Sequence, residues 1–115
     1  MTPMRDDRQR LLDVQEAIAN IEEYATRGKE IFLRDRLIQV WFVHHLQIIG
    51  EAAAGLSREL RERNPDIPWG AAIAMRNMLV HEYFGIDLEE VWKAVTQDLP
   101  KLMRSVERIL KDPSV

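Results

Sequence analysis

Four side chains that could take part in catalysis fall within eight residues of this sequence, between Arg76 and Tyr83. Arginine keeps its positive charge at neutral pH, and histidine takes up and releases a proton near neutrality. Asn77 contributes an amide beside Arg76, and Tyr83 contributes a phenol two residues after His81. A histidine can act as general base or acid, and an arginine can stabilise the negative charge of a phosphorane. Without a metal, this pair suits the cleavage of RNA by its own 2′-hydroxyl group.

The spacing of Arg76 and His81 limits how their side chains can meet. Each residue turns an α-helix by about 100°, so five steps leave the two positions about 140° apart on one continuous helix. Asn77 and His81, four residues apart, would share a face. Arg76 and His81 could converge if the helix ends before His81, or if a two-fold axis brings two copies of the segment together. In a locally extended segment, His81 and Tyr83 would lie on one side.

The other histidines do not indicate a metal site. His44 and His45 are adjacent, so they diverge by about 100° on a helix and cannot both bind one ion. The sequence has no cysteine, and no two histidines stand four residues apart. We therefore predict no metal and no cofactor, and we interpret His44 or His45 as a hydrogen-bonded histidine at a helix interface.

The composition is that of an ordinary globular domain. Of the 115 residues, 46% are hydrophobic and 30% are charged, with a net charge of −3. This charge argues against sequence-blind nucleic-acid binding over a broad surface. Arginine is dense near residues 5–10, 34–36 and 58–63, where it could pair with neighbouring carboxylates or border a phosphate-binding cleft. The polar N-terminus, the lack of cysteine and the absence of a membrane-spanning apolar run favour a cytoplasmic protein.

Helical periodicity extends along the whole chain, and no strand is predicted. We expect a first helix over about residues 4–26, ended by Gly28. A second helix over about residues 30–63 would be about 50 Å long, so it should kink near Gly50 or Gly55 or extend along a partner. Its two apolar stripes suggest one burial in the core and another against a second subunit, and Gly50, Ala53 and Ala54 would let another helix approach closely. The alternative is a kinked central helix that is wholly buried in a monomer. The stripes are Ile38, Trp41, His45, Ile48, Ala52 and Gly55, and Leu37, Val40, Ile49, Ala53, Leu56 and Leu60.

Prolines and glycines divide the second half of the chain. A turn at residues 64–68 should precede a third helix from Trp69 to His81. After a break near Gly85, Asp87 should cap a last helix that reaches about residue 110, and Pro100 should bend or split that helix. The sum is an all-α protein, an antiparallel bundle of four or five helices that forms one domain over residues 1–115.

Several segments of this sequence resemble a known family. They are Ile67-Pro68-Trp69, the run from Ala74 to Asp87, Val91-Trp92 and, upstream, Ile49-Gly50-Glu51-Ala52. From about residue 48 to residue 92 the chain resembles the HepT-like toxins. These are HEPN-domain proteins encoded beside a minimal nucleotidyltransferase, MntA.

The resemblance implies an all-α HEPN fold, a homodimer formed through the long second helix and the motif region, and metal-independent cleavage of RNA at the dimer cleft. It assigns the catalytic arginine to Arg76, its polar companion to Asn77 and the catalytic histidine to His81. It also implies that an MntA-like antitoxin transfers AMP to Tyr83, which would silence the toxin by adding negative charge and bulk. Glu51 matches a family position that we expect to hold Arg76 or Asn77 in place.

Two other interpretations stay open. The bundle could be a non-catalytic subunit that docks a nucleotidyltransferase or presents a nucleotide to it, with Arg76 on a phosphate and His81 structural. Alternatively, Arg76 and His81 could belong to a polar network that stabilises a dimer. Cleavage of RNA in EDTA, lost in His81→Ala, would separate catalysis from both.

Overall fold

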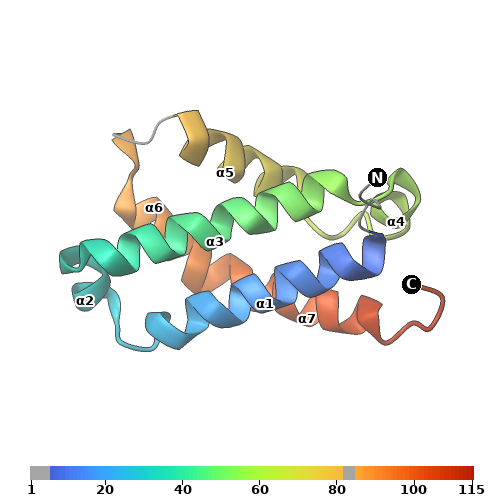
Figure 1. The fold of residues 1–115 in the computed structure, drawn as a ribbon, viewed down its shortest axis with the longest axis horizontal. Helices are drawn as coiled ribbons and strands as arrows, with labels where there is room; N and C mark the ends of the chain where they lie inside the picture. The colour runs from blue at the N-terminus through green and yellow to red at the C-terminus, as the bar shows by residue number, and fades with distance from the viewer. Residues whose placement is uncertain (1–5, 82–84) are drawn as a thin grey trace, which may run out of the picture.

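The computed structural model describes residues 6–81 and 85–115, with the backbone alone at His81. Within these ranges every regular element is a helix, so the predicted all-α class is confirmed. The long helices lie side by side in a body of 43 × 27 × 27 Å (Figure 1). In chain order the elements are α1 (Asp7–Ala25), α2 (Lys29–Arg34), α3 (Arg36–Gly55), α4 (Arg58–Arg63), α5 (Trp69–His81), α6 (Leu88–Lys93), the π-helix η2 (Ala94–Asp98) and α7 (Leu99–Leu110).

Helix α1 begins at a capped residue and ends close to Gly28, while the start predicted near residue 4 lies outside the described residues. Asp6 accepts a hydrogen bond from the Gln9 amide, and the Gln9 side chain accepts one from the Asp6 amide, which forms a reciprocal capping box. At the other end Gly28 has a φ of 97°, a left-handed conformation that glycine adopts without steric cost. The predicted end of the first helix at Gly28 is confirmed.

The prediction of one helix over residues 30–63 is wrong, because two capping residues divide it into three. Asp35 has an extended backbone, and its carboxylate accepts hydrogen bonds from the amides of Leu37 and Ile38 at the start of α3. Ser57 caps α4 in the same way through the amide of Leu60. The chain therefore breaks at Asp35 and after Gly55, which confirms the interruption predicted near Gly55, while Gly50 lies within α3.

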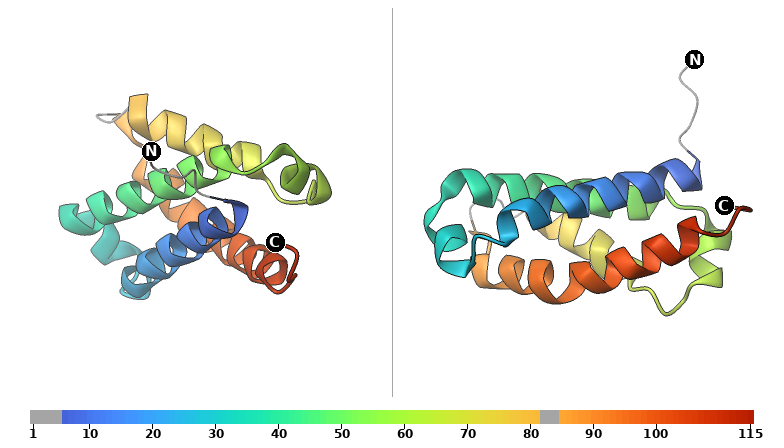
Figure 2. Two further views of the ribbon diagram at one scale, coloured as in Figure 1. Left: turned by 45° about the vertical axis from the view of Figure 1, so that its right-hand side comes forward. Right: turned by 90° about the horizontal axis from the view of Figure 1, so that it is seen from below.

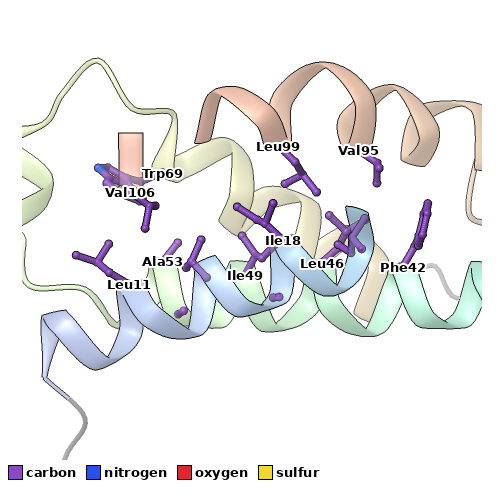
Figure 3. Packing of buried hydrophobic residues seen from close by; sticks show 14 of the residues in the cluster. Leu11, Ile18, Phe42, Leu46, Ile49, Ala53, Trp69, Val95, Leu99 and Val106 are labelled. Atoms are coloured by element: carbon purple, nitrogen blue, oxygen red, sulfur yellow. The ribbon is translucent and has the colours of Figure 1, made fainter. Parts of the chain in front are cut away.

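The hydrophobic core fills the space between α1, α3 and the helices that follow α5 (Figure 3). Phe32 and Phe42 stack with their ring centroids 4.9 Å apart, and Trp92 extends this aromatic group. Most of the second apolar stripe is buried in the same chain, which corrects the expectation of a whole stripe facing a partner. The buried members are Ile49, Ala53, Leu56 and Leu60.

Elements α6, η2 and α7 follow one another without a gap and lie on one side of α1 and α3 (Figure 2). Asp87 caps α6 as predicted, by accepting from the amides of Glu89 and Glu90. The predicted interruption at Pro100 takes the form of a π-turn just before it, in which the Leu99 amide donates to the Ala94 carbonyl, and the chain stays helical. Proline has no amide hydrogen and cannot donate a helical hydrogen bond. A change of helical register beside it limits the number of backbone hydrogen bonds that are lost. Over the described residues, no helix combines the length and apolarity needed to cross a membrane.

Candidate active site

A close contact between α3 and α5 fixes the position of Arg76. The two helices are antiparallel, and α5 lies on the side of α3 away from α1 (Figures 1 and 2). A Cβ atom at Gly50 would lie 2.8 Å from the Ala72 carbonyl oxygen and 2.9 Å from Arg76 Cγ, and it would collide with Arg76 Cβ. The prediction that Gly50 admits a second helix is confirmed, and that helix is α5 of the same chain.

The guanidinium group of Arg76 is oriented by two neighbours. Its Nε donates a hydrogen bond of 2.8 Å to Oδ1 of Asn77, and its Nη1 lies 4.0 Å from Oε1 of Glu51. The Arg76 side chain is 25% exposed, whereas that of Glu51 is 66% exposed. Because the hydrogen bond to Asn77 occupies one of five guanidinium N–H groups, the outer edge can still bind an anion such as a phosphate.

Helix α5 continues to His81, so the arrangement in which the helix ends before His81 is wrong. On this helix the positions of Arg76 and His81 are about 140° apart around the axis, while those of Asn77 and His81 differ by about 40°. Tyr83 lies outside the described residues. Two arrangements were expected to bring Arg76 and His81 together. The arrangement that uses a second copy of the chain is the one that stays a prediction.

Exposed side chains along one stripe of α3 and next to Arg76 on α5 are here called the motif face. Its α3 members follow helical spacing, and its α5 members stand one and four residues after Arg76. It includes large apolar side chains: Leu37 is 81% exposed, Val40 46% and Val80 50%. The motif face consists of Leu37, Val40, His44 and Glu51 from α3 and of Asn77 and Val80 from α5. Large apolar side chains that are exposed along one side of a helix are typical of an interaction surface.

We predicted a hydrogen-bonded histidine, His44 or His45, at a helix interface. His45 does lie at such an interface, buried between α1 and α3 and only 6% exposed, but the predicted hydrogen bond is wrong for it. Neither ring nitrogen has a hydrogen-bond partner among the described residues. Burial lowers the pKa of His45, and the neighbouring His44 lowers it further, while the Glu16 carboxylate opposes both. In the part of the chain that the structure describes, no group of three or more His, Asp or Glu residues is arranged to hold a metal ion.

Comparison with known proteins identifies the family. The family model described as Ribonuclease HepT-like matches residues 14–109. The chain belongs to the HepT-like family. The resemblance noted in the sequence is thereby confirmed, and α3 and α5, which meet at Gly50, both lie within the matched region. No solved structure matches this HepT-like chain.

Individual relatives extend over most of the chain. A Thermococcus cleftensis protein named "probable ribonuclease HepT" is 37% identical over 108 residues, which is 93% of this chain and 98% of the relative. A Methanocaldococcus jannaschii protein provisionally named as an RNase is 36% identical over 107 residues, 90% of this chain and 95% of its own length. A third, from Caldanaerobacter subterraneus and also provisionally named as an RNase, is 36% identical over 98 residues, 85% and 88% of the two chains.

Proposed function

We propose that this HepT-like chain is a metal-independent endoribonuclease that cleaves RNA at a site built from Arg76, Asn77 and His81. One observation carries the proposal: Arg76 packs through its Cβ and Cγ against Gly50, and its guanidinium donates to Asn77 and lies 4.0 Å from Glu51. The proposal is also supported by the match to the Ribonuclease HepT-like family and by relatives that are named as ribonucleases. His81, which lies one helical turn after Asn77, would supply the imidazole that gains and loses a proton.

The active form in this proposal is a homodimer, because one chain leaves Arg76 and His81 at different sides of α5. A two-fold axis beside the motif face would bring the same surface of two copies together. Leu37, Val40 and Val80 would become buried in that interface, and their apolar area would stabilise it. The Arg76 of one subunit would then lie near the His81 of its partner.

The proposed reaction is an internal transesterification. His81 removes the proton from the 2′-hydroxyl, and the 2′-oxygen forms a bond to the adjacent phosphorus. The bond from phosphorus to the 5′-oxygen breaks, and that oxygen takes a proton from an imidazolium acid. Arg76 stabilises the negative charge of the phosphorane, and Asn77 keeps the guanidinium in place. The products are a 2′,3′-cyclic phosphate and a 5′-hydroxyl.

We place this ribonuclease in a cytoplasmic toxin–antitoxin pair with an MntA-like nucleotidyltransferase. The partner would transfer AMP from ATP to the hydroxyl of Tyr83 and release pyrophosphate. The added phosphodiester and nucleoside would repel and obstruct RNA two residues from His81. Mass spectrometry after incubation with the partner and ATP tests this point, and modification at a residue other than Tyr83 would contradict it.

Cleavage of a synthetic RNA in EDTA tests the activity itself. We expect His81→Ala and Arg76→Ala each to lower the rate by about 100-fold or more, with the helical content unchanged. Arg58→Ala is a matched control, because the Arg58 side chain is 88% exposed and forms an ion pair with Glu62 on its own helix. The rate should also pass through a maximum near neutral pH, since histidine must be neutral in one step and charged in the other.

The second candidate function is a non-catalytic subunit that docks the nucleotidyltransferase. The exposed apolar residues of the motif face favour it, because they fit a protein partner as well as a second copy. In that case the RNA would stay intact under all these conditions, and the protein would bind the nucleotidyltransferase tightly through Leu37, Val40 and Val80.

A further inference from the structure

A hollow of about 230 Å³ is formed where α5, η2 and the start of α7 meet over α3. Helix α5 packs on α3, and the hollow lies between α5 and the pair of η2 and α7. Nine of its ten lining residues are apolar, and the tenth is Asp98. The innermost are Leu46, Ile49 and Leu99, none of which is more than 5% exposed (Figure 3).

The size of this hollow points to a ligand. Folded proteins contain few voids larger than a water molecule, because each unfilled space forfeits contacts. An apolar cavity of about 150 Å³ is already large enough to bind benzene. This one is larger, and three alanines in its wall, Ala71, Ala72 and Ala94, leave it unfilled where longer side chains would close it. An apolar group of matching size would bury the exposed part of this wall and be stabilised by it.

The charge of the lining determines which polar group the ligand carries. Asp98 is exposed, and its carboxylate does not accept a hydrogen bond from the amides of the helix that follows it. No lysine or arginine is among the lining residues, so an anion would meet a carboxylate without a compensating cation. The lining therefore favours a ligand that has an apolar body and a cationic N–H donor at one end.

We propose that this hollow binds an arylalkylammonium ion, with the aromatic ring inside and the ammonium group at Asp98. An aromatic ring suits the lining better than an alkyl chain, because the thioether of Met75 makes favourable contacts with aromatic rings. At the exposed Asp98 the ammonium donates to the carboxylate, and water can accept from its other N–H groups. The site uses residues other than Arg76, Asn77 and His81, and it does not depend on ribonuclease activity.

Titration of the whole protein with 2-phenylethylammonium, followed by the NMR signal of the Met75 methyl group, tests the proposal. We expect a saturable shift with half-saturation on the order of 1 mM, as suits a ligand of nine heavy atoms. The anion 3-phenylpropionate has the same ring on a chain of similar length, and it should bind at least about 10-fold more weakly because its charge is opposite. An unchanged Met75 signal, as expected if a second copy of the chain already fills the hollow, would overturn the proposal, and so would equal binding of the two compounds.

One pair of variants tests the charge. Asp98→Asn should weaken the binding of 2-phenylethylammonium by about 5-fold, because the charge-assisted hydrogen bond lies at an exposed position. Glu107→Gln removes the same charge from an exposed position on α7, outside the lining, and should bind like the wild type. Equal binding by these two variants would contradict the placement of the ammonium group.

A second pair tests the hollow itself. Ala71→Leu places a larger side chain in the wall and should abolish the Met75 shift, whereas Ala74→Leu, at an exposed position of the same helix outside the lining, should keep it. Circular dichroism should show the same helical content in both variants. If Ala71→Leu binds 2-phenylethylammonium as the wild type does, the ligand does not occupy this hollow.

Discussion

Replacement of Gly50 with alanine tests whether the contact between α3 and α5 positions Arg76. The new methyl group would lie 2.8 Å from the Ala72 carbonyl oxygen, whereas ordinary contact begins at 3.4 Å. That oxygen belongs to the backbone, so rotation of a side chain does not relieve the overlap. Helix α5 must move away from α3 by roughly 0.6 Å, and by more at Arg76 Cβ, which is closer still.

The cost of this movement follows from packing. Overfilling a well-packed contact lowers the free energy of unfolding by about 1–3 kcal/mol, and the better helix propensity of alanine returns up to about 1 kcal/mol. We expect a net loss of about 1–2 kcal/mol for Gly50→Ala. Because a misplacement of about 1 Å can lower a catalytic rate about 100-fold, RNA cleavage should fall by about 10- to 100-fold.

Gly70→Ala is the matched control. Gly70 also lies in a helix, in the first turn of α5, but beyond its own helix backbone and chain neighbours a Cβ there would meet no atom of the described residues within 4 Å. Urea unfolding, followed by circular dichroism, should show unchanged or increased stability for Gly70→Ala, and its RNA cleavage should match the wild type. A Gly50→Ala protein with wild-type stability and cleavage would refute the reasoning, as would equal losses in both variants.

Three further predictions concern other contacts. Glu51→Gln should change the free energy of unfolding by less than about 0.5 kcal/mol, since this carboxylate is 66% exposed, yet slow RNA cleavage several-fold relative to Glu59→Gln. Leu37→Glu should yield monomers in analytical ultracentrifugation, whereas Leu12→Glu, on α1 at a residue 42% exposed, should not. Burial holds the pKa of His45 below its ordinary value of 6.5, so below about pH 6.5 the unfolded chain binds more protons than the folded protein. The free energy of unfolding, measured with urea at each pH, should therefore fall as the pH drops below about 6.5. His45→Phe should flatten that part of the stability curve.

Features set by local chemistry could be predicted from the sequence. The helical class follows from apolar spacing, and the ends at Gly28 and Asp87 follow from capping rules that involve only a few neighbouring residues. The motif region around Arg76 could be found for the same reason, because its residues are close in sequence. Such predictions need no knowledge of which helix packs on which.

The features that were missed depend on competing signals or on tertiary contacts. Apolar spacing runs through Asp35 without interruption, and only its capping chemistry marks the break. Likewise, the sequence could not show whether the stripe that includes Ile49 and Leu60 is buried in the core or against a partner, because apolar residues are needed in both places. Gly50 indicated a close approach, but the sequence could not show that α5 is the helix that approaches.

Complementation between inactive subunits decides whether the site is shared across a dimer. If Arg76 of one chain works with His81 of its partner, a mixed dimer of Arg76→Ala and His81→Ala subunits has one site with both residues and one with neither. Random mixing places half of the protein in mixed dimers, so about a quarter of the wild-type rate should return. The assay mixes the two variants after mild dissociation and follows RNA cleavage in EDTA.

The same experiment gives no activity if Arg76 and His81 act within one chain, since every chain then lacks one residue. Adding Leu37→Glu to both variants controls for the interface, because it should prevent the mixed dimer and abolish the recovery. If RNA cleavage still recovers when both variants carry Leu37→Glu, the motif face is not the dimer interface. If RNA cleavage does not recover at any mixing ratio, the active site is not shared between subunits. Because α5 continues to His81 and separates the two positions by about 140°, recovery is the result that the structure predicts.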